Sequence, residues 1–443
     1  IFDEINRKTE NIRAKTAEHA ADCYLPMKHF IETLNKHGYN IADYNNWYMN
    51  VFALAGKNEA EFEKYQAERS KPLQRAAKAA MDSGQISYRE LENYLILKHG
   101  QERNKYYKER DEKLGVKPMK DYSGTEAVMF EEFCKRTGIK VKTIEEDIPT
   151  LVDGDPNMIR YDNGKSEFSK DGKKIPDFEV NKRFELWRKQ HTPEEIIKDY
   201  EEKIGKEKVE DLWSKIRKAT QFTLDCQKEG GLTSEDMYKK ASGMWEYFVP
   251  LRGFDMGTAQ DEYDYDLNGI TLFTDFRVEQ TLGRTRRSVS PLAWTEQMAH
   301  ITIQQKNKNL LNQSLRRLAS VSTARKDNIM FLSKQYKAPD VIENGKVVRE
   351  GALINPPAHT GNPTEDRAAF ERWETSMKEG VKNGTVEVVE HSNVNFGMIV
   401  SADKVKQHVV RVYEGGRPVD IIFNTSPSVP RAINGLNHKA AIS

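Results

Sequence analysis

Amphipathic segments with helix-capping signals fill most of residues 3–250. Ser87 with Glu90, and Thr192 with Glu195, have the spacing of capping boxes, in which side chain and backbone at a helix start satisfy each other. Apolar residues recur after each box every three or four positions, along one helical face. The pattern predicts long helices joined by short connections. We therefore expect a mainly α fold, a multi-helix array or bundle.

Two stretches interrupt this pattern and divide the chain. Prolines and glycines break every periodic run between about 143 and 190, which predicts a long loop or small irregular subdomain. Glycines and charged clusters fill 252–292, and helix resumes from about Pro291 to Lys334. The expected regions are an N-terminal helical region at 1–142, the irregular subdomain at 143–190, a central helical region at 191–338 and a C-terminal module at 339–443.

The C-terminal module combines one helix with strands. Apolar residues at helical spacing predict a helix from Glu365 to Gly380. Two strand-like segments, 407–413 and 419–423, flank a turn that contains Gly415 and Gly416, and this pattern is typical of a β-hairpin. The module is therefore expected to be a small α+β unit.

Composition excludes several classes of protein. The 69 Lys and Arg residues nearly balance the 68 Asp and Glu residues, so the surface as a whole would not attract nucleic acid. No apolar run approaches the roughly 18 residues of a membrane span. The three cysteines are scattered, and the common zinc, phosphate-loop, dinucleotide and nucleophile-elbow motifs are absent. We therefore assign no catalytic residue, metal ligand or cofactor.

A local basic run is the best candidate for phosphate binding. Three guanidinium groups within four residues can make bidentate contacts to phosphates, and two more follow on the next helix. The candidate residues are Arg284, Arg286, Arg287, Arg316 and Arg317. Acidic residues cluster just before this run, at 261–266, so the arginines could equally pair with these acids. A nucleic-acid-binding module is the first alternative function.

Two further clusters leave an enzyme open as the second alternative. His99, Glu102 and Arg103 share one helical face, which suits either a general base with an orienting carboxylate or a surface ion-pair cluster. Asp261, Asp264 and their acidic neighbours suit either a divalent metal or a strand that packs its tyrosines inward. In both cases the structural interpretation is favoured.

Three segments together resemble one protein family. Tyr94-Leu95-Ile96-Leu97-Lys98-His99 is followed by Glu102-Arg103-Asn104, and the second segment runs from Trp245 through Pro250, Leu251 and Arg252 to Phe254. The third contains Gly283-Arg284 and then Lys306-Asn307 or Lys308-Asn309. These segments resemble, in order, motifs of the very large polyvalent proteins of the PLxRFG type, which bacteriophages and conjugative elements encode. The PLxRFG core departs from the family form, because Gly253 separates Arg252 from Phe254.

The resemblance implies a non-enzymatic structural or cargo module. Such a module would be packaged in the virion interior and delivered with the DNA to the host cytoplasm. Its partners would be other parts of the parent polyvalent protein or virion proteins, with nucleic acid as a further partner in the alternative. The chain begins with Ile1 and not with Met, so we expect a processed product or a piece of a longer protein.

Overall fold

A computed structural model provides the fold. It describes residues 28–34, 36, 42–118, 121–143, 149–152, 155–161, 166–251, 288, 290–320, 330–332, 334–343, 346–349, 351–354, 357, 363–390, 409–423, 426 and 428–435. Within these residues the protein is mainly helical, with small antiparallel sheets and strand pairs. The predicted fold class is therefore confirmed.

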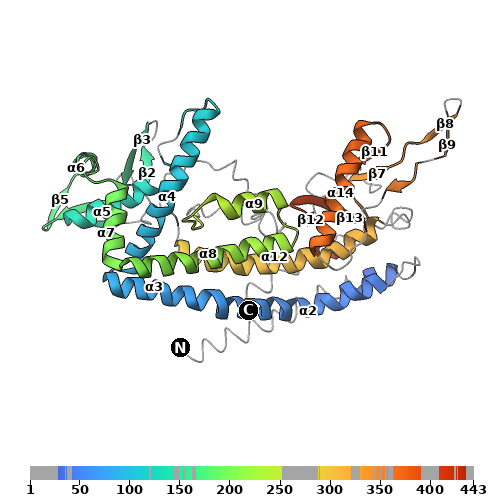
Figure 1. Ribbon diagram of the computed structural model, residues 1–443, viewed down its shortest axis with the longest axis horizontal. Coiled ribbons are helices and arrows are strands. Elements are labelled where there is room, and N and C mark those ends of the chain that lie inside the picture. Colours follow the sequence, from blue (N-terminus) through green and yellow to red (C-terminus); the bar gives the residue numbers. More distant parts are fainter. Residues whose placement is uncertain are drawn as a thin grey trace.

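Long helices that lie side by side form the frame of an elongated molecule (Figure 1). α2 (Ala42–Tyr65) continues through a π-helical turn, η1 (Gln66–Ser70), into α3 (Lys71–Gly84). α8 (Lys206–Glu229) packs on α3, while α12 (Pro291–Ser320) packs on both α2 and α8. This frame connects the two ends of the molecule.

Further helices and short strands cover the first end of the frame (Figure 1). The helices are α4 (Tyr88–Lys113), α5 (Thr125–Thr137), α6 (Asp177–Trp187), α7 (Pro193–Ile204) and, next to α8, α9 (Glu235–Met244). The strands are β1 (Lys140–Thr143), β2 (Pro149–Val152), β3 (Asp155–Tyr161), β4 (Ser166–Lys170) and β5 (Lys173–Ile175), with β1-β4-β5 as one antiparallel sheet and β2-β3 as a pair.

Both predicted capping boxes are present. The Ser87 and Thr192 side chains accept hydrogen bonds from the backbone N–H groups of Glu90 and Glu195, and the two glutamates return the bond. Gly115 adopts a left-handed φ of 69° just after α4, a conformation that favours glycine and ends a helix.

The stretch from 143 to 190 holds more regular structure than predicted. It contains α6 as well as four of the short strands. Pro176 occupies the N-cap of α6, so it starts this helix and does not interrupt one. Val180 and Phe184 bury one face of α6, but two apolar positions are too few to mark an 11-residue helix by periodicity.

The second end of the frame carries the α+β module (Figure 1). Its strands are β6 (Met330–Leu332), β7 (Lys334–Lys337), β8 (Val341–Glu343), β9 (Lys346–Arg349), β10 (Leu353–Ile354), β11 (Glu387–Glu390), β12 (Val409–Glu414) and β13 (Arg417–Phe423), and its helices are α14 (Pro363–Lys382) and α16 (Ser428–Gly435). The sheets have the orders β12-β13-β6 and β10-β7-β11, and β8 pairs with β9. The predicted hairpin is β12-β13, whose turn places Gly415 and Gly416 at positive φ.

The helix predicted over 291–334 is shorter than expected, because it ends at Ser320. The segment 330–332 pairs instead as β6 with the edge of β13. The three residues of this short strand therefore pair with a strand about 90 positions later in the chain. A local sequence pattern does not reveal such a pairing.

Buried apolar residues form two large clusters and two small ones, of which the smaller is the pair Leu232 and Tyr413. The first, at the α4–α7 end, draws residues from 73 to 292. The second joins the 28–34 helix with the C-terminal half of α12, β6, β12, β13 and α16. The small third cluster, around Tyr65 and Ile303, lies along the frame. The first cluster includes residues from three of the four predicted regions, and the region boundaries stay a prediction.

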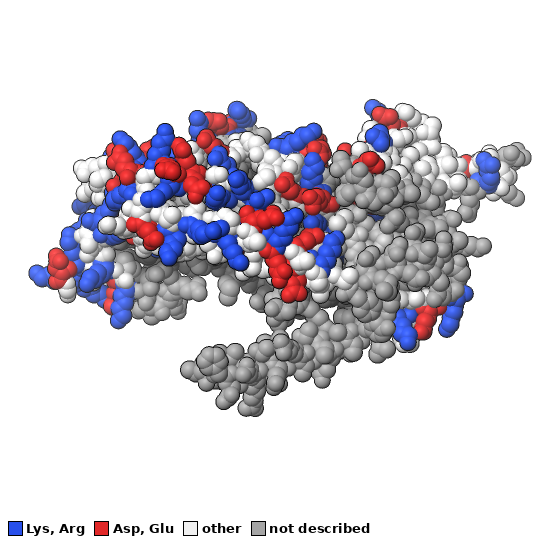
Figure 2. Space-filling model, turned by 60° about the horizontal axis from the view of Figure 1, so that its bottom comes forward, with Lys and Arg blue, Asp and Glu red and all other residues white. Residues whose placement is uncertain are grey.

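The described surface mixes charges of both signs. On the face that Figure 2 shows, basic and acidic side chains lie close together over the helices. Among the helices that the structure describes, none has both the length and the apolar character needed to cross a membrane.

Candidate functional site

Much of the predicted phosphate site lies outside the described residues. This holds for Arg284, Arg286 and Arg287, for the acidic cluster at 261–266, and for Arg252 and Phe254 of the family motif. The side chain of Arg317, on α12, is likewise outside the described set. The predictions for these residues stay predictions.

Arg316 lies in the interior of the protein. Its Nη1 atom is 2.7 Å from Oε1 of Glu414, and only 5% and 6% of the two side chains are exposed. Burial raises the pKa of Glu414, and the Arg316 guanidinium acts in the opposite direction. A guanidinium held this way links α12 to β12 and does not face a surface on which a phosphate backbone could lie. Arg316 therefore does not extend a basic stripe.

The first and second family motifs pack against each other. The Tyr94 hydroxyl accepts a 2.9 Å hydrogen bond from the Trp213 indole N–H and donates one of 3.1 Å to Glu201. Lys98 makes a 2.8 Å ion pair with the same Glu201 carboxylate, and its ammonium lies 4.5 Å from the centre of the Tyr247 ring. Two charged groups and three aromatic rings thus join α4, α7 and α8 to the segment after α9.

His99 is fully buried among aromatic rings. The rings of Trp245 and Phe248 meet the imidazole edge to face, with centroids 5.6 Å and 5.4 Å away. Burial, helped by the Arg103 guanidinium, lowers the pKa of His99 to about 3. The imidazole is therefore neutral near pH 7. The favoured prediction of a surface ion-pair cluster is wrong for His99, because the sequence does not show that the 245–248 segment covers this face of α4.

Glu102 is used as a backbone cap. Its Oε2 atom accepts hydrogen bonds, each of 3.1 Å, from the N–H groups of Glu246 and Tyr247. The carboxylate is thus committed to the backbone, and it does not act as the predicted orienting partner of His99. The contact joins residues 144 positions apart in the chain.

Arg103 and Asn104 hold the turn that starts α5. Arg103 donates from Nε to the Tyr122 carbonyl, and the Asn104 amide bonds to both the Tyr122 N–H and the Asp121 carboxylate. The Asp121 carboxylate also accepts backbone N–H groups at the start of α5, those of residues 123, 124 and 126. Burial is the largest influence on Asp121 and raises its pKa, against the effect of these N–H groups. Sequence reasoning missed Asp121, although an acidic residue shortly before a helix start is a recognisable capping signal.

Gly100 allows α4 and this turn to approach closely. A Cβ atom at Gly100 would lie 2.2 Å from Cγ2 of Thr125, far inside van der Waals contact, and its next neighbour, Cβ of Ser123, would be 3.4 Å away. We expect Gly100→Ala to lower the free energy of unfolding by about 1–3 kcal/mol, although alanine is the better helix former. Urea denaturation followed by far-ultraviolet circular dichroism measures the change.

Thr125→Ser provides the matched test of that prediction. Serine removes Cγ2 but keeps the hydroxyl that donates to Asp121. In the Thr125→Ser background, Gly100→Ala should therefore be neutral or stabilise the protein by up to about 1 kcal/mol. An equal loss of stability in both backgrounds would show that the Thr125 methyl is not the obstacle.

The described part of the third family segment, Lys306 to Asn309 on α12, forms a second set of polar contacts between elements. Lys306 pairs with Glu61 of α2 at 2.8 Å and with Glu229 of α8 at 3.3 Å. The Asn307 amide donates to Asn58 and Glu61 of α2. These side chains join three frame helices across their buried faces.

Lys308 and Asn309 extend these contacts to the α+β module. The Lys308 ammonium donates at 2.6 Å to the carbonyl of Asn434 on α16, and burial lowers its pKa to about 8. Asn309 donates to the carbonyls of Gly230 and Tyr413 and accepts the Tyr413 N–H. One amide side chain thereby satisfies both backbone groups of Tyr413, much as a neighbouring strand would.

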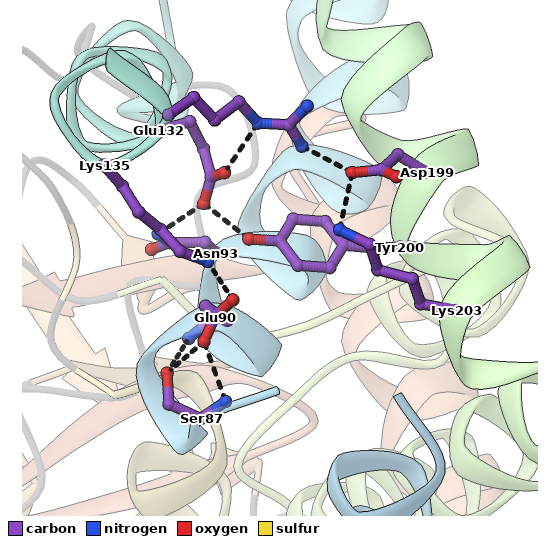
Figure 3. Close-up of polar contacts among 9 residues, drawn as sticks. Ser87, Glu90, Asn93, Glu132, Lys135, Asp199, Tyr200 and Lys203 are labelled. Carbon is purple, nitrogen blue, oxygen red and sulfur yellow. Dashed lines mark hydrogen bonds and ion pairs between the residues drawn. The ribbon is translucent and has the colours of Figure 1, made fainter. Parts of the chain in front are cut away.

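A third buried network lies between α4, α5 and α7 (Figure 3). The Glu132 carboxylate, 1% exposed, accepts hydrogen bonds from Asn93 at 3.2 Å, from the Tyr200 hydroxyl at 2.5 Å and from Arg136 at 3.4 Å. Arg136 continues to Asp199, which also pairs with Lys203. Burial raises the pKa of Tyr200, and the Glu132 carboxylate adds to this effect. Sequence reasoning did not single out Glu132, since two of its three partners, Asn93 and Tyr200, lie on other helices.

These networks position helices and strands relative to one another. Within the described residues, no three His, Cys, Asp or Glu side chains are arranged to hold a metal ion. Burial raises the pKa of both Cys134 and Cys226 to about 12, so neither thiol is ionised near pH 7. The contacts of the described motif residues join segments that are distant in the chain.

Comparisons with protein-family models, with curated proteins and with solved structures found no match to this chain. The resemblance to polyvalent proteins therefore stays a prediction.

Proposed function

We propose that the chain is a non-enzymatic structural module of a phage or mobile-element polyvalent protein, packaged in the particle and delivered to the host with the DNA. One observation carries the proposal: the described motif residues serve packing. His99 and Glu102 of the first motif hold the 245–248 part of the second. Tyr94 bonds to Trp213 of α8, whose ring in turn contacts Tyr247. A motif used for catalysis would instead present polar atoms to a substrate.

The frame also suits a protein that must cross a narrow channel and refold. Helices form most of their contacts locally, and proteins rich in local contacts fold fast. Cys134 and Cys226 are free thiols, so no disulfide between them would have to open during passage. Neither property is unique to cargo proteins, and both agree with the proposal.

Mass spectrometry of purified, nuclease-treated particles tests it directly. Peptides from across residues 28–435 should be present in particles in defined stoichiometry, well above an abundant host cytosolic protein that serves as the contamination control. In recipient cells treated with a translation inhibitor, the same peptides should appear within minutes of DNA entry. Their appearance only after new synthesis, together with their absence from particles, would overturn the proposal.

With Arg316 buried, the nucleic-acid alternative rests on Arg317 and on the run of Arg284, Arg286 and Arg287. If it holds, reversing the three charges of the run should weaken DNA binding and lower the slope of log K against log salt by about 2–3. Reversal of the exposed Lys105 and Lys108 of α4 is the control. Binding that ignores both salt and the reversal would exclude this alternative.

A further inference from the structure

A cavity of about 400 Å³ opens beside the second family motif. Its lining residues come from η1, α8, α9, the 245–250 segment and the first turns of α12. Its volume is within the range of sites that bind small molecules. Trp245, Phe248 and Pro250 form one wall, so the segment that covers His99 on one side borders this cavity on the other.

The interior of the cavity is mostly apolar. Its other large apolar lining residues are Phe222, Leu224, Met244 and Met298. Three threonines also line it, but the hydroxyls of Thr220, Thr223 and Thr295 each donate to a carbonyl of their own helix. The threonines therefore do not require hydrogen bonds from an occupant, and the interior favours an apolar one.

Three cationic side chains stand around this apolar interior. Arg217 and Lys218 are exposed on α8, and Arg69 is half-buried in η1. Among the residues that the structure describes, none of the three has a carboxylate within ion-pair distance; Arg69 donates to a backbone carbonyl, that of Glu68. A carboxylate does line the cavity, at Asp225, but it accepts hydrogen bonds from Gln221 and from the Tyr238 hydroxyl.

We propose that this pocket binds a small amphiphile that has an apolar chain and a carboxylate head, such as a medium-chain fatty acid. The chain lies against the aromatic and methionine side chains, where it leaves water. The carboxylate lies at the rim, where the guanidinium groups of Arg69 and Arg217 can donate bidentate hydrogen bonds and Lys218 adds a third positive charge. Charge complementarity selects an anionic head over a neutral or cationic one.

Isothermal titration calorimetry of the full chain with decanoate tests the site. Decanoate should bind roughly tenfold more tightly than octanoate, because two more methylene groups are buried. It should also bind roughly tenfold more tightly than decan-1-ol, which has no charge, and decyltrimethylammonium should bind more weakly still. Equal binding of decanoate and decan-1-ol, or no binding of decanoate, would overturn the proposal.

Variants locate the binding to this pocket. Arg217→Gln with Lys218→Gln should weaken decanoate binding roughly tenfold and leave decan-1-ol binding unchanged, whereas Lys105→Gln with Lys108→Gln, the same charge change on α4, should alter neither. Ala241→Phe fills the cavity from α9 and should abolish binding of both ligands, with an unchanged circular dichroism spectrum as the folding control. Undiminished binding to the filled variant would overturn the assignment. So would binding of an acidic amphipathic peptide by a protein that does not bind decanoate.

Discussion

Replacing Glu132 by alanine is expected to lower the free energy of unfolding by about 3–5 kcal/mol. The change removes the shared acceptor of three buried or half-buried donors, on Asn93, Arg136 and Tyr200. The buried Tyr200 hydroxyl would then lose the carboxylate to which it donates, and the penalty for a buried donor without an acceptor exceeds the net value of a typical hydrogen bond. Urea denaturation followed by tryptophan fluorescence measures the loss, since Trp213 belongs to the same apolar cluster.

The neighbouring residue provides the control for this prediction. Glu131 pairs with Arg89 near the surface, and Glu131→Ala should cost no more than about 1 kcal/mol. Tyr200→Phe removes the hydroxyl that loses its acceptor in Glu132→Ala. In the Tyr200→Phe background, Glu132→Ala should therefore lower the free energy of unfolding by less, with a coupling energy of about 1–2 kcal/mol. A loss for Glu132→Ala as small as that for Glu131→Ala would mean that water replaces the carboxylate at little cost.

The helical frame could be predicted from sequence because its signals are local. A capping box such as Ser87 with Glu90 is complete within four residues, and so is the stop at Gly115. The hairpin is equally local, because two glycines fix its turn and its strands pair directly. At these positions the folded protein agrees with the prediction.

The polar interior could not be predicted, because each contact joins segments far apart in the chain. The run from Gln304 to Arg316 has the composition of a solvated surface, yet Lys306, Asn309 and Arg316 are buried. The partner of Asn309 is Tyr413, 104 positions later. Burial of a polar side chain is favourable only when such a partner exists, and no local spacing identifies it.

For the first family motif, the sequence predicted the spacing of the residues but not their surroundings. Spacing correctly places His99, Glu102 and Arg103 near one another on α4. It does not show that residues 91–97 are buried on all sides, so that this part of the helix has no water-facing stripe. Once the 245–248 segment covers the helix, the same three residues become packing and capping groups.

Acidification from pH 7 to pH 4.5 should destabilise the protein through His99 by about 2–3 kcal/mol. Because the pKa of His99 falls from 6.5 to about 3 on burial, the unfolded chain binds a proton below pH 6.5 that the folded protein does not. The unfolded state therefore gains stability as the pH falls through this window, and the contribution of neutral His99 to folding is lost progressively down to about pH 3. Urea denaturation at half-unit pH intervals measures it.

Comparison with two variants isolates the imidazole from the carboxylates that also titrate in this range. His99→Leu removes the titrating group. Below pH 6.5 the wild type should therefore lose about 1.4 kcal/mol of unfolding free energy per pH unit relative to this variant. Phe248→Leu disturbs the same aromatic contact without removing a titrating group, so its cost should be nearly constant with pH. If the wild-type and His99→Leu curves stayed parallel down to pH 4.5, His99 would have to take up its proton in the folded protein, and the 245–248 segment would have to open to water.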